Sequence, residues 1–282
     1  YLAELALGLP VASIGPSVAS IYGAKLRLGG ALTVSISQSG RSPDIVELAR
    51  AARAGGALTL AVTNDPASPL AQASDRTLAL HAGPERSVAA TKTFVTSAVA
   101  CLSLIAEWSR DAALIRAIAT LPDAFARAIS ADWSPLAVAL KDAGTLYTLG
   151  RGPAWAMSNE AALKFKETCL IHAESYSSAE VLHGPVSIVS PGFPVLAFAA
   201  ADAAEASLAE AADGLAAKGA RVFATTALVR AATQLPATRT GHPLADPLAL
   251  IVSFYAMVEQ LAVARGIDPD TPRHLNKVTQ TT

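Results

Sequence analysis

Residues 31–44 read ALTVSISQSGRSPD, and this stretch decides the fold because two kinds of periodicity meet in it. Residues 31–37 are a short β-branched and apolar run, which predicts a strand. From Ser42 to Ala54 the apolar side chains recur at helical spacing, and Gly55-Gly56 follows as a signal that ends a helix. A strand that passes through a polar turn into a helix is the βα unit of a layered α/β protein.

The same alternation continues along the chain and starts again near residue 145. Strands alternating with helices indicate parallel βαβ units, so the expected fold class is α/β. Two similar series predict two tandem copies of one module, joined around 120–140, with domains at 1–125 and 126–282. The expected strands cover 11–14, 31–37, 58–63, 77–80, 145–149, 187–189, 195–199 and 221–224. The expected helices cover 42–54, 89–108, 114–129, 154–167, 205–217 and 247–264.

Charge and composition restrict the class of ligand. The 282 residues carry a formal net charge of -1, and 16% of them are charged. A near-neutral chain lacks the broad basic surface that nucleic acid or anionic lipid requires, so we expect neither partner. An anion would have to be held locally, by a few side chains and by the backbone. A small anionic ligand fits that requirement better than a polymer.

Cysteine content and hydropathy suggest a compartment. Cys101 and Cys169 lie in apolar surroundings, which indicates two buried thiols and a reducing, cytoplasmic location. The longest apolar runs, such as 94–107 and 191–201, stop short of the roughly 20 residues that a spanning helix needs. The chain opens at Tyr1 as a helix already under way, so we expect sequence upstream of it. Five histidines without metal-ligand spacing give no indication of zinc.

The turn after the strand expected at 31–37 is a candidate phosphate site. The first N–H groups of a helix have no internal partner, and they point at the preceding loop together with the positive end of the helix dipole. In open parallel sheets, ligands bind beyond the carboxyl ends of the strands, where this loop lies. The alternative is an ordinary serine-rich helix cap. The candidate ligands are Ser37, Gln38, Ser39 and Ser42, with Gly40 allowing close backbone approach.

The densest polar cluster lies at 160–185. Glu160, Lys164 and Glu167 fall at i, i+4 and i+7 and therefore share one helix face. Such a stripe is either a row of surface ion pairs or a carboxylate tuned by a neighbouring lysine to act as a general base. His183 stands in a Leu-His-Gly-Pro turn, where an imidazole can project, although a lone histidine is more often structural. Residues 87–93 form another serine- and threonine-rich helix start, which carries weight only alongside the other motifs.

These motifs occur together in one order. The segments are SQSG (37–40), AATK (89–92), AALKFKE (161–167), EVLHGP (180–185) and PRHLNK (272–277). The series closely resembles the sugar isomerase (SIS) superfamily. The similarity is greatest to the isomerase half of glucosamine-6-phosphate synthase and its relatives without a glutaminase domain, and it covers essentially the whole chain. The resemblance implies two SIS modules, each a flavodoxin-like parallel sheet flanked by helices, in a homodimer.

The resemblance also implies a role for each motif. Ser37, Gln38, Ser39 and Ser42 would hold the phosphate of a small phosphorylated sugar, with Lys164 beside the substrate. Glu167 would move a proton between C1 and C2. His183 would open the sugar ring, reaching the site of the neighbouring subunit. Lys277, on the C-terminal tail, would close over the site. This chemistry needs a base and positive charge, and no metal or organic cofactor.

Three departures from the family pattern matter. Ala90 stands where a small polar residue is usual, so one contact to the phosphate or sugar is in doubt. Arg41 replaces a common acidic residue, which we expect to make the loop more positive. We expect neither the glutaminase domain nor the family's first βα unit within these 282 residues.

These features favour an enzyme that converts glucosamine 6-phosphate to fructose 6-phosphate and ammonia. One alternative is the isomerase domain of a glutamine-dependent synthase. Others are a relative acting on glycated amino-acid or galactosamine-type phosphates, and a non-catalytic sugar-phosphate sensor.

Overall fold

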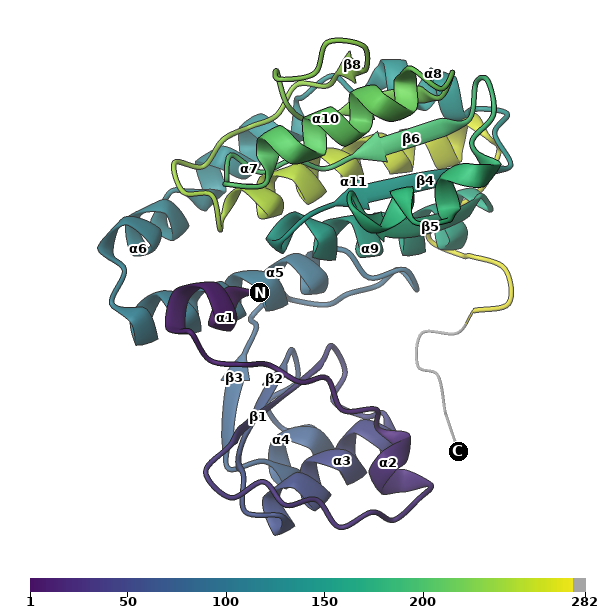
Figure 1. The fold of residues 1–282 in the computed structure, drawn as a ribbon. Helices are drawn as coiled ribbons and strands as arrows, with labels where there is room; N and C mark the ends of the chain where they lie inside the picture. The colour runs from purple at the N-terminus through teal and green to yellow at the C-terminus, as the bar shows by residue number, and fades with distance from the viewer. Residues whose placement is uncertain (276–282) are drawn as a thin grey trace. The chain divides into compact units, whose positions relative to one another are not determined.

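The computed structural model describes residues 1–275, and the chain divides into two compact units (Figure 1). The β1–β3 unit comprises Leu9–Leu104 and, among the described residues, 274–275. The β4–β8 unit comprises Ile105–Arg273 together with Tyr1–Gly8. The boundary between the units falls inside one long helix, α5 (Lys92–Ser109). The domain division at 125/126 stays a prediction.

The β1–β3 unit is a three-stranded parallel sheet in the order β1-β2-β3, with Leu32 opposite Leu58 and Leu60 opposite Arg76. Val46 and Ala49 of α3 pack with Leu70 of α4 and with Ala61 of the middle strand. The two helices therefore cover one face of this sheet. The elements of this unit are α2 (Ser17–Ser20), β1 (Leu32–Ser37), α3 (Pro43–Ala54), β2 (Leu58–Thr63), α4 (Pro69–Ala73), β3 (Arg76–Ala79) and the first part of α5.

The β4–β8 unit contains a five-stranded parallel sheet in the order β5-β4-β6-β7-β8. Its strands are β4 (Thr145–Gly150), β5 (His172–Ser177), β6 (Pro194–Ala197), β7 (Arg221–Ala224) and β8 (Thr233–Gln234). Its helices are α1 (Leu2–Leu7), α6 (Ala112–Ala119), α7 (Leu121–Ile129), α8 (Ser134–Leu140), α9 (Pro153–Cys169), α10 (Glu205–Ala216) and α11 (Asp246–Ala264), with 3₁₀ turns η1 (Glu180–Leu182) and η2 (Pro185–Ile188).

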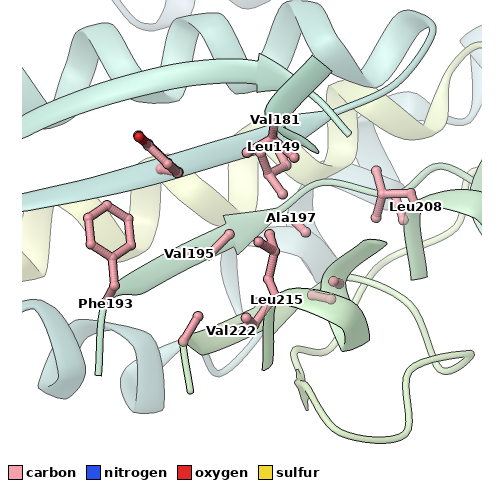
Figure 2. Packing of buried hydrophobic residues seen from close by; sticks show 13 residues of the cluster. Leu149, Val181, Phe193, Val195, Ala197, Leu208, Leu215 and Val222 are labelled. Carbon is pink, nitrogen blue, oxygen red and sulfur yellow. The ribbon is translucent and has the colours of Figure 1, made fainter. Parts of the chain in front are cut away.

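One face of the five-stranded sheet is covered by α10. Leu208 and Leu215 of this helix pack against Leu149, Val195 and Val222 of the central strands, as Figure 2 shows. All five side chains are almost completely buried. Burying a side chain of this size contributes about 1.5–3 kcal/mol, so this cluster fixes the sheet that carries the functional loops.

The opposite face is covered by α9 and α11. Phe254 of α11 makes ring contacts with Phe165 of α9 and with Phe198 beyond β6, and Trp133 contacts Phe198 in turn. Within the described part of the chain, α11 is the one helix long and apolar enough to suit a membrane span, but most of that stretch is buried in the protein. The core position explains its composition.

Most of the expected elements are confirmed, and the two-module α/β architecture is confirmed with them. The strand expected at 11–14 is wrong: these residues form no strand, and Val11 is exposed. Pro10 and Pro16 flank them and lack the N–H that a ladder needs. The strand expected at 187–189 is also wrong, because the chain there closes i to i+3 hydrogen bonds of a 3₁₀ turn.

Two further differences concern helices and an edge strand. The helix expected at 114–129 is two helices that break at Thr120, and Pro122 lies in the first turn of the second one. No strand was expected at β5, because its residues His-Ala-Glu-Ser-Tyr-Ser are mostly polar. A strand at a sheet edge with partial exposure needs few apolar side chains.

Candidate functional site

The turn after β1 is held by its own serines. The Ser37 hydroxyl accepts a hydrogen bond from the Gly40 N–H at 3.1 Å, and the Ser39 hydroxyl accepts one from the Arg41 N–H at 3.3 Å. A serine that accepts such a bond keeps its own O–H proton as a donor. Both hydroxyls are partly exposed and can donate to an anion.

The turn requires glycine at position 40. Its φ angle is +61°, and a Cβ added there would lie 2.2 Å from Oγ and 2.6 Å from Cβ of Ser68. The Gly40 carbonyl also accepts the Leu70 N–H at 3.0 Å. The turn is therefore packed directly against the start of α4, and this close approach fixes its shape.

Ser42 is at the N-cap position of α3, but its side chain forms no capping hydrogen bond. The alternative interpretation, that these serines only cap the helix, predicts such a bond. The Ser42 hydroxyl stays partly exposed at the positive end of a 12-residue helix. This observation favours an anion at the helix start over an ordinary cap.

Hydrogen bonds link the three loops that follow β1, β2 and β3 at one edge of the sheet. Asn64 donates its backbone N–H to the Gln38 carbonyl at 3.1 Å, and its side chain bonds the backbone at 82–83 in the third loop. Arg41 contacts Asp65 at 2.9 Å. Asp65, in the loop after β2, therefore offsets the charge that Arg41 brings to the turn, and the expectation that this turn is more positive than in the family stays a prediction.

The start of α5 is capped from a distance. A Glu85 oxygen accepts the Thr93 N–H at 2.8 Å and the Thr93 hydroxyl at 2.6 Å. Ala90, in the segment before this helix, is partly buried and brings no polar atom. An open hollow of about 430 Å³ adjoins the segment, and its lining includes two cationic side chains. The lining residues are Pro84, Glu85, Arg86, Ser87 and Lys92.

In the β4–β8 unit, the structure brings Glu160, Lys164 and Glu167 of α9 together. The Lys164 Nζ lies 2.5 Å from a Glu167 oxygen and 3.4 Å from a Glu160 oxygen. Lys164 is 4% exposed and Glu160 8%. The surface-stripe alternative is therefore wrong for these two residues. A buried ammonium shared by two carboxylates is a costly arrangement, which makes it a candidate functional site.

The surroundings of the two carboxylates differ. Burial raises the pKa of Glu160, while Lys164 and a hydrogen bond from Tyr255 oppose the shift. The Tyr255 hydroxyl, on α11, donates to Glu160 at 2.7 Å. The Glu167 side chain is 20% exposed, so it is the carboxylate that a ligand can reach. Sequence reasoning missed Tyr255, because it lies 95 positions from Glu160 with no motif around it.

His183 follows η1 in a turn that is anchored on both sides. Val181 is fully buried in the cluster that contains Leu149 (Figure 2), and the Tyr147 hydroxyl donates to the Pro185 carbonyl at 3.0 Å. His183 itself is exposed. Within residues 1–275, no hydrogen bond or ion pair joins it to Glu167. Lys277, the other expected catalytic residue, lies outside the described residues.

No group of three or more metal-ligating side chains occurs in the portion of the chain that the structure describes. On α9, Glu160, Lys164 and Glu167 contact one another instead. The sites carried by the two units thus have different chemistry: hydroxyl and backbone donors after β1, and a carboxylate–ammonium cluster on α9.

The sequence and the fold of this chain are similar to those of known proteins. The sequence model of the SIS domain matches residues 29–107 and 139–265, which is more than half of the chain. The chain belongs to the SIS domain family. The first matched stretch contains the three-stranded sheet and the second contains the five-stranded sheet, so each unit carries one SIS domain match. The family resemblance inferred from the motifs is thereby confirmed.

Individual SIS relatives are similar over nearly the whole chain. The isomerizing glutamine–fructose-6-phosphate aminotransferase of Aeropyrum pernix is 38% identical over 302 residues, covering 98% of this chain and 47% of the relative. This chain therefore spans about half the length of that relative.

Two solved SIS structures match as well. A candidate phosphosugar isomerase of Silicibacter pomeroyi is 64% identical with a TM-score of 0.92, over 95% of this chain and 82% of that one. The C-terminal domain of glucosamine-fructose-6-phosphate aminotransferase of Francisella tularensis is 25% identical with a TM-score of 0.80, over 96% and 82%.

Proposed function

We propose that this chain is a phosphosugar isomerase that converts glucosamine 6-phosphate to fructose 6-phosphate and ammonia. In this reaction Glu167 removes the C2 proton of the open-chain sugar and delivers it to C1. The C2 amine becomes an imine, and water then releases ammonia and leaves the C2 ketone. The reaction consumes water and no oxidant or reductant.

The observation that carries the proposal is the Lys164–Glu167 pair. A proton transfer next to a carbonyl or iminium needs a carboxylate base and a nearby cation for the charge that develops. The buried Lys164 ammonium contacts the partly exposed Glu167 carboxylate, so the cation is held beside a base that a ligand can reach. The names of the relatives above, which include phosphosugar isomerase and aminotransferase, support the same substrate class.

The turn after β1 is proposed as the phosphate anchor. The donors are the partly exposed hydroxyls of Ser37, Ser39 and Ser42 and the N–H groups at the start of α3. The turn also contains one cation, Arg41, which is paired with Asp65. The Gln38 side chain adds an amide. Ala90 contributes only its backbone and its small size.

The remaining roles require more than one chain. Exposed His183 is proposed to reach the site of a neighbouring subunit, which would make a homodimer the active form. Lys277 is proposed to close over the bound sugar from the C-terminal tail. A cytoplasmic location accompanies this proposal, since sugar phosphates are made and consumed there.

The test is turnover by the full-length protein. Glucosamine 6-phosphate is incubated with the wild type, Glu167→Gln and the control Glu210→Gln, whose exposed carboxylate lies on α10. Sugar products are followed by NMR and ammonia by a coupled assay. We expect coupled release of ammonia and fructose 6-phosphate, lost in Glu167→Gln only. Tight binding with unchanged sugar would contradict the proposal and favour a sensor.

A second candidate is the isomerase half of a glutamine-dependent synthase. It is favoured by the named function of the Aeropyrum pernix relative, of which this chain covers 47%. The two functions differ in the source of nitrogen. Glucosamine 6-phosphate formation from fructose 6-phosphate that depends on glutamine in the complete protein would support the synthase, and dependence on free ammonia alone would support the deaminase.

A further inference from the structure

The Glu160 carboxylate is a buried ionisable group that the proposed reaction does not use. It lies one helical turn before Lys164 on α9, and it has two polar partners from different elements. One is the Lys164 ammonium at 3.4 Å, and the other is the Tyr255 hydroxyl of α11 at 2.7 Å, both on the same oxygen, Oε1. Burial of a carboxylate costs several kcal/mol unless it is compensated, so both contacts matter.

The three charged groups form a chain from the helix–helix interface to the exposed side of α9. Tyr255 contacts Glu160, Glu160 contacts Lys164, and Lys164 contacts Glu167. The Glu160 and Lys164 side chains are 7% and 4% exposed, whereas the Glu167 side chain at the end of this series is 20% exposed. The Lys164 backbone is also fixed, because the Thr168 hydroxyl donates to its carbonyl at 2.7 Å.

We propose that Tyr255 and Glu160 are positioning residues, which hold the Lys164 ammonium between two carboxylates so that it stays beside Glu167 without being fully neutralised by it. The inference rests on the proposed function, because it assigns these residues to the base of that reaction. In this proposal neither residue contacts the substrate, and both act through Lys164.

A lysine bonded to a single carboxylate makes that carboxylate a weaker base, since the charged form gains the whole attraction. Sharing the ammonium with Glu160 divides the attraction. Removing the Glu160 charge with Glu160→Gln therefore directs Lys164 to Glu167 alone. The expected result is a fall in kcat of about tenfold with little change in KM, and an acid limb of the kcat/KM profile that moves to lower pH.

Tyr255→Phe tests the same series of contacts at the residue that binds Glu160. The hydrogen bond from Tyr255 lowers the pKa of Glu160, so its loss raises that pKa and makes Glu160 resemble glutamine as the pH falls. We expect the acid limb to move in the direction seen for Glu160→Gln, but less far. In the double variant, Tyr255→Phe should add less than twofold to the effect of Glu160→Gln, because both act through one charge.

The chain offers a matched control. The Tyr176 hydroxyl donates to Glu174 at 3.0 Å, which is another partly buried tyrosine–glutamate pair in the same unit without contact to Lys164. Tyr176→Phe should leave the pH profile unchanged. A purely structural effect of Tyr255→Phe would lower stability without moving the pH profile, and a thermal melt of each variant separates the two.

The experiment combines kinetics with a titration that does not need activity. NMR of [¹³C]Glu-labelled protein follows the Glu160 carboxyl signal, assigned by its loss in Glu160→Gln, and Tyr255→Phe should move its midpoint to higher pH. An active wild type with unchanged variant kinetics, or an unmoved Glu160 titration, overturns the inference alone. A wild type that turns over no phosphosugar overturns the proposed function, and with it the positioning role.

Discussion

The substitution Gly40→Ala tests the account of the proposed phosphate anchor at its most constrained point. The new Cβ would lie 2.2 Å from Oγ and 2.6 Å from Cβ of Ser68, and 3.1 Å from the Thr63 hydroxyl. Favourable contacts between heavy atoms begin near 3.5 Å, so Ser68 has to move by about 1 Å. Ser68 is completely buried, and its hydroxyl caps α4 by accepting the Ala71 N–H.

The expected destabilisation combines three effects. An alanine at φ near +60° costs about 1–2 kcal/mol relative to glycine. Loss of the Ser68 cap costs about 1 kcal/mol, and overpacking of a closed site costs about 1–3 kcal/mol. The total is about 4 kcal/mol. The control is Gly23→Ala in the same unit, at φ +57° with no atom within 4 Å of an added Cβ. It isolates the backbone effect of about 1–2 kcal/mol.

Amide hydrogen exchange of the β2 amides in both variants measures the stability of this unit separately from the rest of the chain. Calorimetric titration with fructose 6-phosphate then reports the anchor, and we expect weaker binding in Gly40→Ala alone. If Gly40→Ala and Gly23→Ala differed by less than about 0.5 kcal/mol, Ser68 would be yielding freely. The claim that close approach fixes the turn would then be refuted.

Three further predictions concern the β4–β8 unit. Asp213 accepts hydrogen bonds from the backbone N–H groups of residues 230–232, and these bonds lower the pKa of its carboxyl group. The stabilisation that they provide is therefore present above pH 3.8 and is lost as the pH falls through the lower pKa of the folded state. Acid titration should show that Asp213→Asn is least harmful at the acid end, and a pH-independent effect would contradict this. Lys164→Met leaves Glu160 buried without its cation and should lower the free energy of unfolding by about 3 kcal/mol in urea melts. The control Lys166→Met loses one hydrogen bond to a backbone carbonyl and should lower it by less than about 1.5 kcal/mol. Equal effects of the two substitutions would count against a buried ion cluster. Burial raises the pKa of the Cys169 thiol, so it should react with a thiol reagent only as fast as the protein unfolds, and rapid labelling of the native state would show that the site is open.

Local periodicity was enough to predict most of the architecture. The αβ alternation, the α9 face that carries Glu160, Lys164 and Glu167, and the loop after β1 all follow from spacing and turn residues. These features depend on neighbours within one or two helical turns, which a sequence displays directly. The strand expected at 11–14 was wrong. A short apolar run resembles a strand in the sequence, but the prolines on both sides of it have no N–H to donate to a neighbouring strand.

Features that depend on tertiary contact were not predictable in the same way. The stripe on α9 could have been a surface row of ion pairs, and only the packing of α11 shows that Lys164 and Glu160 are buried. Tyr255 meets Glu160 across that packing, 95 residues along the chain. Asp65 offsets the charge of Arg41 from a neighbouring loop. In each case the partner is supplied by the fold.

The central claim is that Glu167 moves a proton between C1 and C2 of a phosphorylated sugar. It is tested most directly by incubating the full-length protein with fructose 6-phosphate or glucosamine 6-phosphate in D₂O and following C1 and C2 by NMR. We expect enzyme-dependent exchange of deuterium at these carbons, reduced by about 10²–10⁴-fold in Glu167→Gln and unchanged in Glu210→Gln. Exchange that persists in Glu167→Gln, or the absence of both exchange and isomerisation with every phosphosugar that the wild type binds, would contradict it.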